Sequence, residues 1–284
     1  MCRMSVLAAT ALILAAGAIP AAAGSKAQAP GAGRGGATAS PAAAPAAAQS
    51  ERPLPASAEQ RIVARRLDPL ARAAFWARET SLDGSDPEAA TGLAQALREL
   101  GRAEEAVEPV QALLAARPDN VEGLLELARV YLTLSQGFYA IEPAQKARAL
   151  APRDWRAPGL LAIAYEQAQR DDEALSAHRA AVALAPDNPA PLTNLGMFLA
   201  GRGEIGEAER ILRQASALPG ADARTRQNLA LVLGLQGRLG EAEALARRDL
   251  PPDVVANNLA WLKAASATQE PRSWSSVRDA SPGP

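Results

Sequence analysis

The chain has 284 residues, of which 48% are hydrophobic, 21% are charged and only 4% are aromatic, and its formal net charge is -1. This apolar content excludes a wholly disordered chain, and the near-neutral charge argues against nucleic acid as a partner, because a nucleic-acid surface needs a basic excess. One histidine and one cysteine exclude most metal sites and any intrachain disulfide, and we expect neither a metal nor a cofactor.

Residues 1–23 have the features of a secretory signal peptide. A basic residue near the start is followed by an uncharged apolar run over residues 6–19, which is too short for a membrane-spanning helix. Small residues at 21–23 fit a cleavage site before Gly24. The alternative is a buried N-terminal helix, but nothing just after Gly24 continues a fold. Cys2 leaves with the signal, so the mature chain is expected to lack a lipidated cysteine and a transmembrane span.

Residues 24–57 are predicted to form a disordered Ala/Pro/Gly-rich linker. From Gly24 to Ser50 there is no aromatic, Val, Ile, Leu or Met residue, so the segment cannot bury enough apolar surface to fold. The Ser- and Pro-rich residues 267–284 are predicted to be a flexible tail, in which Trp274 is a candidate to dock on the fold. One folded domain is therefore expected over residues 58–266.

The predicted domain repeats with a period of 34 residues. Pro118, Pro152 and Pro186 lie 34 residues apart, and each ends a predicted helix. Alignment on these prolines also superimposes small residues such as Ala94 and Ala128. Small residues at this position let two antiparallel helices approach closely, and the next pair of helices covers the hydrophobic face that remains. The alanine-rich composition suits such closely packed helices better than a sheet.

The ends of the predicted helices carry their own signals. Asp86-Pro87 and Asn188-Pro189 each place a capping residue before a proline at the first helical position. Gly101, Gly203 and Gly237 fit left-handed turns between the first and second helix of a pair. Acidic clusters are expected to open the second helices, where the helix dipole favours negative charge.

These positions resemble tetratricopeptide repeats. The resemblance implies an all-α, right-handed solenoid of about five to six stacked helix-turn-helix pairs. A degenerate unit is expected before the clear repeats, with Trp76 at a large position but Arg72 where a small residue recurs. The last clear repeat departs from the pattern at residues 249–252. Clear repeats are predicted at 87–120, 121–154, 155–188, 189–222 and 223–250.

The residues needed for catalysis are scarce, and we expect no catalytic site and no small-molecule substrate. A hydrolytic triad needs a histidine or an equivalent base beside a nucleophile. The only histidine, His178, lies where the repeat places a large core residue, which favours packing over a role as a base. No phosphate-binding glycine loop lies between a predicted strand and a predicted helix.

A concave groove lined by the first helices is the predicted surface for protein partners. Asn194, Asn228 and Asn258 each precede a Leu-small pair, and an amide can both donate and accept, so a row of amides can hold a peptide backbone. The resemblance to tetratricopeptide repeats implies the same use of these asparagines. The alternative is that they satisfy a neighbouring helix end or a contact between repeats. The other predicted groove residues are Arg98, Arg129, Arg156 and Arg224, with Glu88, Glu122 and Glu166 among them. The apolar residues Leu125, Ile163, Met197 and Leu231 should lie nearby and could offer apolar contact, but the repeat favours a place in the core for them.

The C-terminal repeats more specifically resemble TadD proteins, which are tetratricopeptide components of the tight-adherence (Flp) pilus assembly machinery. Residues 226–238, 241–243, 246–252 and 257–262 carry this resemblance, which covers about 68–265 and is most specific over 186–262. It implies a non-enzymatic periplasmic scaffold whose partners are pilus assembly components, the outer-membrane secretin among them. Two alternatives are an adaptor of another envelope machine, such as exopolysaccharide export, and an enzyme or a subunit of one.

Overall fold

The computed structural model describes residues 54–267 of the chain. The predicted signal peptide, most of the predicted linker and the tail from residue 268, with Trp274, lie outside these residues. The chain divides into two units, Met1–Leu54 and Pro55–Pro284, and every described helix belongs to the second. Over residues 54–267 the secondary structure is entirely helical, which confirms the predicted all-α class.

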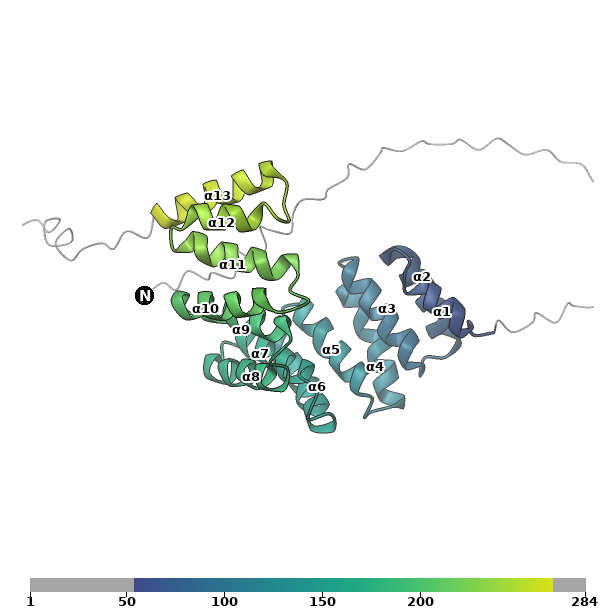
Figure 1. Ribbon diagram of the computed structural model, residues 1–284. Coiled ribbons are helices and arrows are strands. Elements are labelled where there is room, and N and C mark those ends of the chain that lie inside the picture. The colour runs from purple at the N-terminus through teal and green to yellow at the C-terminus, as the bar shows by residue number, and fades with distance from the viewer. Residues whose placement is uncertain (1–53, 268–284) are drawn as a thin grey trace, which may run out of the picture. The chain divides into compact units, whose positions relative to one another are not determined.

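Antiparallel helix pairs stack one after another in this second unit, which confirms the predicted solenoid (Figure 1). Each second helix packs against the first helix of the next pair as well as against its own partner. Two helices, α1 (Ala58–Ala64) and α2 (Pro69–Leu82), precede the pairs, and α13 (Pro252–Ala267) follows them and packs on α11 and α12. The pairs are α3 (Pro87–Glu99) with η2 (Ala103–Ala106) and α4 (Val107–Ala116); α5 (Val121–Thr133) with α6 (Gly137–Leu150); α7 (Arg156–Gln167) with α8 (Asp171–Leu184); α9 (Pro189–Gly201) with α10 (Ile205–Ala217); and α11 (Ala223–Leu235) with α12 (Leu239–Ala246).

Two of the first helices begin as their sequence predicts. The Asp86 side chain accepts hydrogen bonds from the backbone N–H groups of Glu88 and Ala89 at the start of α3. The Asn188 side chain accepts one from the backbone N–H of Ala190 at the start of α9. In both helices a proline follows at the first position, where its missing N–H costs no hydrogen bond.

The turn between the two helices of a pair contains one left-handed residue. The predicted Gly101, Gly203 and Gly237 have φ values of 74°, 83° and 77°. Ser135 and Gln169 occupy the same position in the intervening repeats, with φ values of 58° and 59°. The left-handed conformation therefore recurs every 34 residues, whether or not a glycine is present.

The second helix of the first clear pair begins later than its acidic cluster suggests. Glu104 and Glu105 lie in the short 3-10 helix η2, and the α-helix starts at Val107. Pro109 explains the delay, because its ring has no N–H to donate and collides with the carbonyl group of the residue four positions before it in regular α-helix. The tighter 3-10 turn accommodates this proline.

Close approach between helices is visible at the small positions of the repeat. Ala94 and Ala128 are fully buried. Gly196, at the equivalent position of α9, leaves so little space that a Cβ atom there would lie 2.6 Å from Leu212 Cγ of α10. In the degenerate N-terminal unit, the buried Trp76 of α2 packs in the same way against Gly92 of α3.

Candidate partner-binding groove

Side-chain contacts join the first helices of successive pairs. Arg98 Nε of α3 lies 2.7 Å from Glu126 Oε1 of α5, and the hydroxyl groups of Thr193 in α9 and Thr225 in α11 lie 3.1 Å apart. Neighbouring first helices are therefore in direct side-chain contact.

The three predicted asparagines, called the asparagine row below, lie on α9, α11 and α13, and α11 contacts both of the other helices. Asn194, Asn228 and Asn258 are all partly buried. Their side-chain amides make no hydrogen bond with any other residue between 54 and 267. No hydrogen bond in this part of the chain thus supports the alternative that they satisfy a helix end or a contact between repeats. Each amide keeps a donor and an acceptor for a ligand.

A second row of apolar side chains follows the asparagines by one helical turn. Met197, Leu231 and Trp261 each lie three residues after an asparagine, and Ile163 holds the same repeat position in α7. Residues three apart lie on one face of a helix. Ile163 and Met197 are partly exposed, and Trp261 is 40% exposed. Leu125 and Leu231 are buried in the core, which is the place that the repeat favours for them.

Three of the four predicted arginines are held by carboxylates. Arg98 and Arg129 both bind Glu126, with Arg129 Nη1 3.1 Å from Glu126 Oε2. Arg156 Nη2 lies 2.6 Å from both Glu122 Oε1 and Asp154 Oδ2, and its hydrogen bonds hold the pKa of the Asp154 carboxyl below the ordinary value. Within residues 54–267, Arg224 is exposed and forms no ion pair.

Glu126 is a structurally important residue of this region that sequence reasoning missed. It is only 4% exposed and holds two arginines, one from the neighbouring helix α3. Its signal was present in the repeat, because Glu126 lies two repeat lengths before Asn194 at the same position of a first helix. This repeat position therefore holds a glutamate with two ion pairs in α5, and in α9 and α11 an asparagine whose side chain makes no hydrogen bond within residues 54–267.

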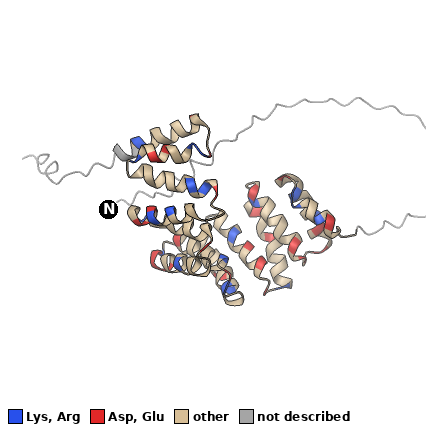
Figure 2. Ribbon diagram, in the orientation of Figure 1, with Lys and Arg blue, Asp and Glu red and all other residues tan. Residues whose placement is uncertain are grey.

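The other predicted groove carboxylates are also engaged. Glu88 binds Arg61 and Arg65 of α1, which ties that short helix to α3. Figure 2 shows acidic and basic residues interspersed along the same helices. The charges in this region mainly hold helices together, and the surface offered to a ligand lies in the amide and apolar rows.

His178 occupies a packing position, as its place in the repeat predicts. It is 1% exposed, and its ring lies 5.1 Å from that of Phe198 between centroids. Its Nε2 lies 2.6 Å from Glu166 Oε1, and its Nδ1 has no hydrogen-bond partner among residues 54–267. This histidine therefore links α7, α8 and α9.

Comparison with known proteins supports the repeat assignment. Family models described as tetratricopeptide repeat match residues 87–108, 189–214 and 223–250. A thermophilic tetratricopeptide repeat protein from Thermus thermophilus is 27% identical, with a TM-score of 0.56 over 63% of this chain and 100% of the other. A tetratricopeptide repeat protein from Parabacteroides merdae is 14% identical, with a TM-score of 0.60 over 73% of this chain and 86% of the other. No significant match is found among curated protein sequences.

The chain is therefore a solenoid protein built of tetratricopeptide repeats. Proteins with this architecture generally act as scaffolds for other proteins, typically without catalysis of their own. Over residues 54–267, none of the helices combines the length and the apolar character needed to cross a membrane.

Proposed function

We propose that this protein is a non-enzymatic scaffold that holds an extended segment of a protein partner along its first helices. The row of three unpartnered asparagine amides is the observation that carries this proposal. Amides that both donate and accept suit the main chain of a partner, whatever its side chains are. The nearby Ile163, Met197 and Trp261, which are partly or largely exposed, offer apolar contact to the side chains of the same segment.

We infer further that the scaffold acts in the periplasm, in assembly of the Flp pilus machinery. The resemblance to TadD proteins, which is most specific over residues 186–262, supports this role, as does the signal-like sequence of residues 1–23. All three asparagines fall within residues 186–262. The candidate site thus coincides with the part of the chain that most resembles TadD, and the expected partners are pilus assembly components, including the secretin.

The groove is tested by a photo-reactive amino acid placed at Met197, which is partly exposed beside the amide row. In cells that make the pilus machinery, we expect crosslinks to its components. The double variant Asn194→Ala plus Asn228→Ala should lower crosslinking about tenfold, because hydrogen bonds to the partner main chain are lost. The melting temperature should change little, since these amides make no hydrogen bond within residues 54–267.

Gln214→Ala is the matched control, because it removes an exposed amide from the second helix α10. Crosslinking that is unchanged in the double asparagine variant contradicts the groove. The role in the envelope has a separate test, in which deletion of the gene should abolish surface Flp pili. Normal pili in the deletion strain contradict the pilus role and leave the groove result standing.

A further inference from the structure

The second helix of one repeat breaks the pattern of the others. Phe138 and Tyr139, in the first turn of α6, are 75% and 61% exposed. The equivalent positions in the preceding repeat are Glu104 and Glu105, and those in the following repeat are Asp172 and Glu173. Acidic residues at a helix start are favoured by the helix dipole, whereas Phe138 and Tyr139 gain nothing from the dipole and leave most of their apolar surface exposed.

A recurring ion pair is lost at the same place. In three repeats an arginine before the second helix binds the glutamate three residues later: the nitrogen–oxygen distance is 2.6 Å in Arg102–Glu105, 2.7 Å in Arg170–Glu173 and 2.6 Å in Arg238–Glu241. The corresponding residues in α6 and its preceding turn are Gln136 and Tyr139. This repeat therefore lacks an ion pair that stabilises the start of the second helix in three other repeats, and it exposes two aromatic side chains in its place. Such an exchange is typical of a binding site.

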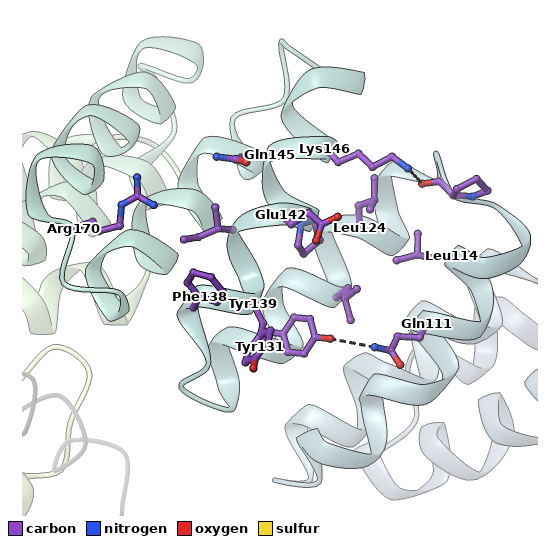
Figure 3. A pocket seen from close by; sticks show the side chains of 14 residues that line it. Gln111, Leu114, Leu124, Tyr131, Phe138, Tyr139, Glu142, Gln145, Lys146 and Arg170 are labelled. Atoms are coloured by element: carbon purple, nitrogen blue, oxygen red, sulfur yellow. Dashed lines mark hydrogen bonds between the residues drawn. The ribbon is translucent and has the colours of Figure 1, made fainter.

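These aromatic residues border a cleft of about 520 Å³. Its walls come from α4 and α6, and its floor from α5, so it is lined mainly by second helices and includes none of the three asparagines. Figure 3 shows Phe138, Tyr139 and Tyr131 gathered on one side, with Gln111 and Leu114 across the cleft. The Tyr131 and Tyr139 rings lie 5.8 Å apart between centroids.

The cleft offers ring faces together with hydroxyl donors. Gln111 Nε2 donates to Tyr131 Oη at 3.2 Å, which leaves the Tyr131 hydroxyl proton available to a ligand. The Tyr139 hydroxyl accepts and donates no hydrogen bond within residues 54–267. Aromatic faces with adjacent donors suit a polyproline II segment, because its prolines pack on rings and its carbonyl groups have no internal donors.

The charges around the cleft define the occupant further. Lys146 Nζ is held by Asp119 Oδ1 at 3.0 Å and by the Pro118 carbonyl at 2.6 Å, and Arg170 is held by Glu173. Glu142 is exposed and forms no ion pair within residues 54–267. The cleft therefore has one uncompensated charge, which is negative and complements a single basic residue.

We propose that this cleft is a second binding site, which takes an extended proline-rich segment of a partner protein with one basic residue. The site is independent of the groove on the first helices. Phe138 and Tyr139 pack on proline rings, Tyr131 donates to a main-chain carbonyl, and Glu142 pairs with the basic side chain.

The test uses a fluorescently labelled polyproline peptide with a central arginine and measures its binding to the full chain by anisotropy. The double variant Phe138→Glu plus Tyr139→Glu restores the acidic helix start of the other repeats, so its melting temperature should equal or exceed that of the wild type. Its affinity for the peptide should fall about tenfold or more. Glu142→Gln should weaken the arginine peptide by roughly threefold and leave an uncharged polyproline peptide unaffected.

A glycine–serine peptide of the same length with a central arginine is the control ligand and should bind at least about tenfold more weakly. Equal binding of the two peptides, or full affinity in the stable double variant, overturns the proposal. Asn194→Ala plus Asn228→Ala should leave polyproline binding intact. Loss of binding in that variant would place the peptide in the groove and would also overturn the second site.

Discussion

At the scale of single residues, the left-handed turn positions show what residue type reveals and what it hides. A glycine between two predicted helices indicates a left-handed conformation, and Gly101, Gly203 and Gly237 confirm this. Ser135 and Gln169 adopt the same conformation without that signal, because the packing of the two helices fixes the turn. Only the 34-residue register, not the residue type, could have identified these two positions.

Replacing Ser135 by glycine should therefore stabilise the protein. A side chain in the left-handed region costs about 1–2 kcal/mol, and the added chain entropy of glycine offsets part of the relief, so we expect a gain of about 0.5–1 kcal/mol in the free energy of unfolding. Gln169→Gly should gain less, because the Gln169 side chain donates to the Glu166 carbonyl. Urea titration measures both variants. Gly101→Ala, where the added methyl group meets no atom, should lose about 1 kcal/mol, and a destabilised Ser135→Gly variant contradicts this explanation.

At the scale of helices, repeat alignment predicted which positions are small but not how much space each one has. Ala94 and Ala128 accommodate a methyl group at the small position, whereas Gly196 faces the branched carbon of Leu212. The same limit applies to the candidate site. Sequence reasoning found Asn194, Asn228 and Asn258, but it could not show that their amides are unpartnered, because hydrogen bonding depends on neighbouring helices.

Gly196→Ala should lower the free energy of unfolding by about 1–3 kcal/mol, even though alanine is the common residue at this repeat position. The added carbon would lie 2.6 Å from Leu212 Cγ, which the packed core cannot easily move. Gly206→Ala, in α10 where the added methyl group meets no atom, should instead stabilise the helix by about 0.5 kcal/mol. Chemical denaturation compares the two, and equal effects of the two substitutions would contradict the close contact.

At the scale of the whole molecule, the fold followed from the period of the sequence, whereas the ion pairs between repeats did not. A 34-residue period fixes helix order and stacking, but the partner of a flexible arginine depends on the spacing of neighbouring helices. Two examples join the repeats at 189–222 and 223–250: Arg238 with Glu209, and Arg213 with Glu241. Such contacts make the stability of the stack depend on pH.

Glu209 gives the clearest case. Hydrogen bonds from Arg213 and then Gln236 lower the pKa of its carboxyl from 4.5 to about 2 in the folded protein. A lowered folded-state pKa stabilises the protein above the unfolded value, and this contribution is lost as the pH falls from about 4.5 through about 2. In Glu209→Gln, the loss of stability on acidification over this window should be about 1 kcal/mol smaller than in the wild type.

Urea titrations at neutral pH and near the lower end of this window measure the difference. Glu105→Gln is the control, because its exposed pair with Arg102 is screened by solvent and should change the acid response less. The same acid response in Glu209→Gln and the wild type contradicts a role for this carboxyl group.

The two tryptophans of the first and last long helices have a practical consequence. Trp76 is 2% exposed at the junction of α2 and α3, whereas Trp261 is 40% exposed on α13. Each helix pair in a solenoid contacts only its neighbours, so the two ends can open separately. With the other tryptophans replaced, Trp76 emission becomes an optical reporter of opening at the N-terminal end. Trp261 emission reports in the same way on the C-terminal end, which holds the asparagine row. Opening of the N-terminal end and binding of a partner at the C-terminal end can therefore be followed as separate signals.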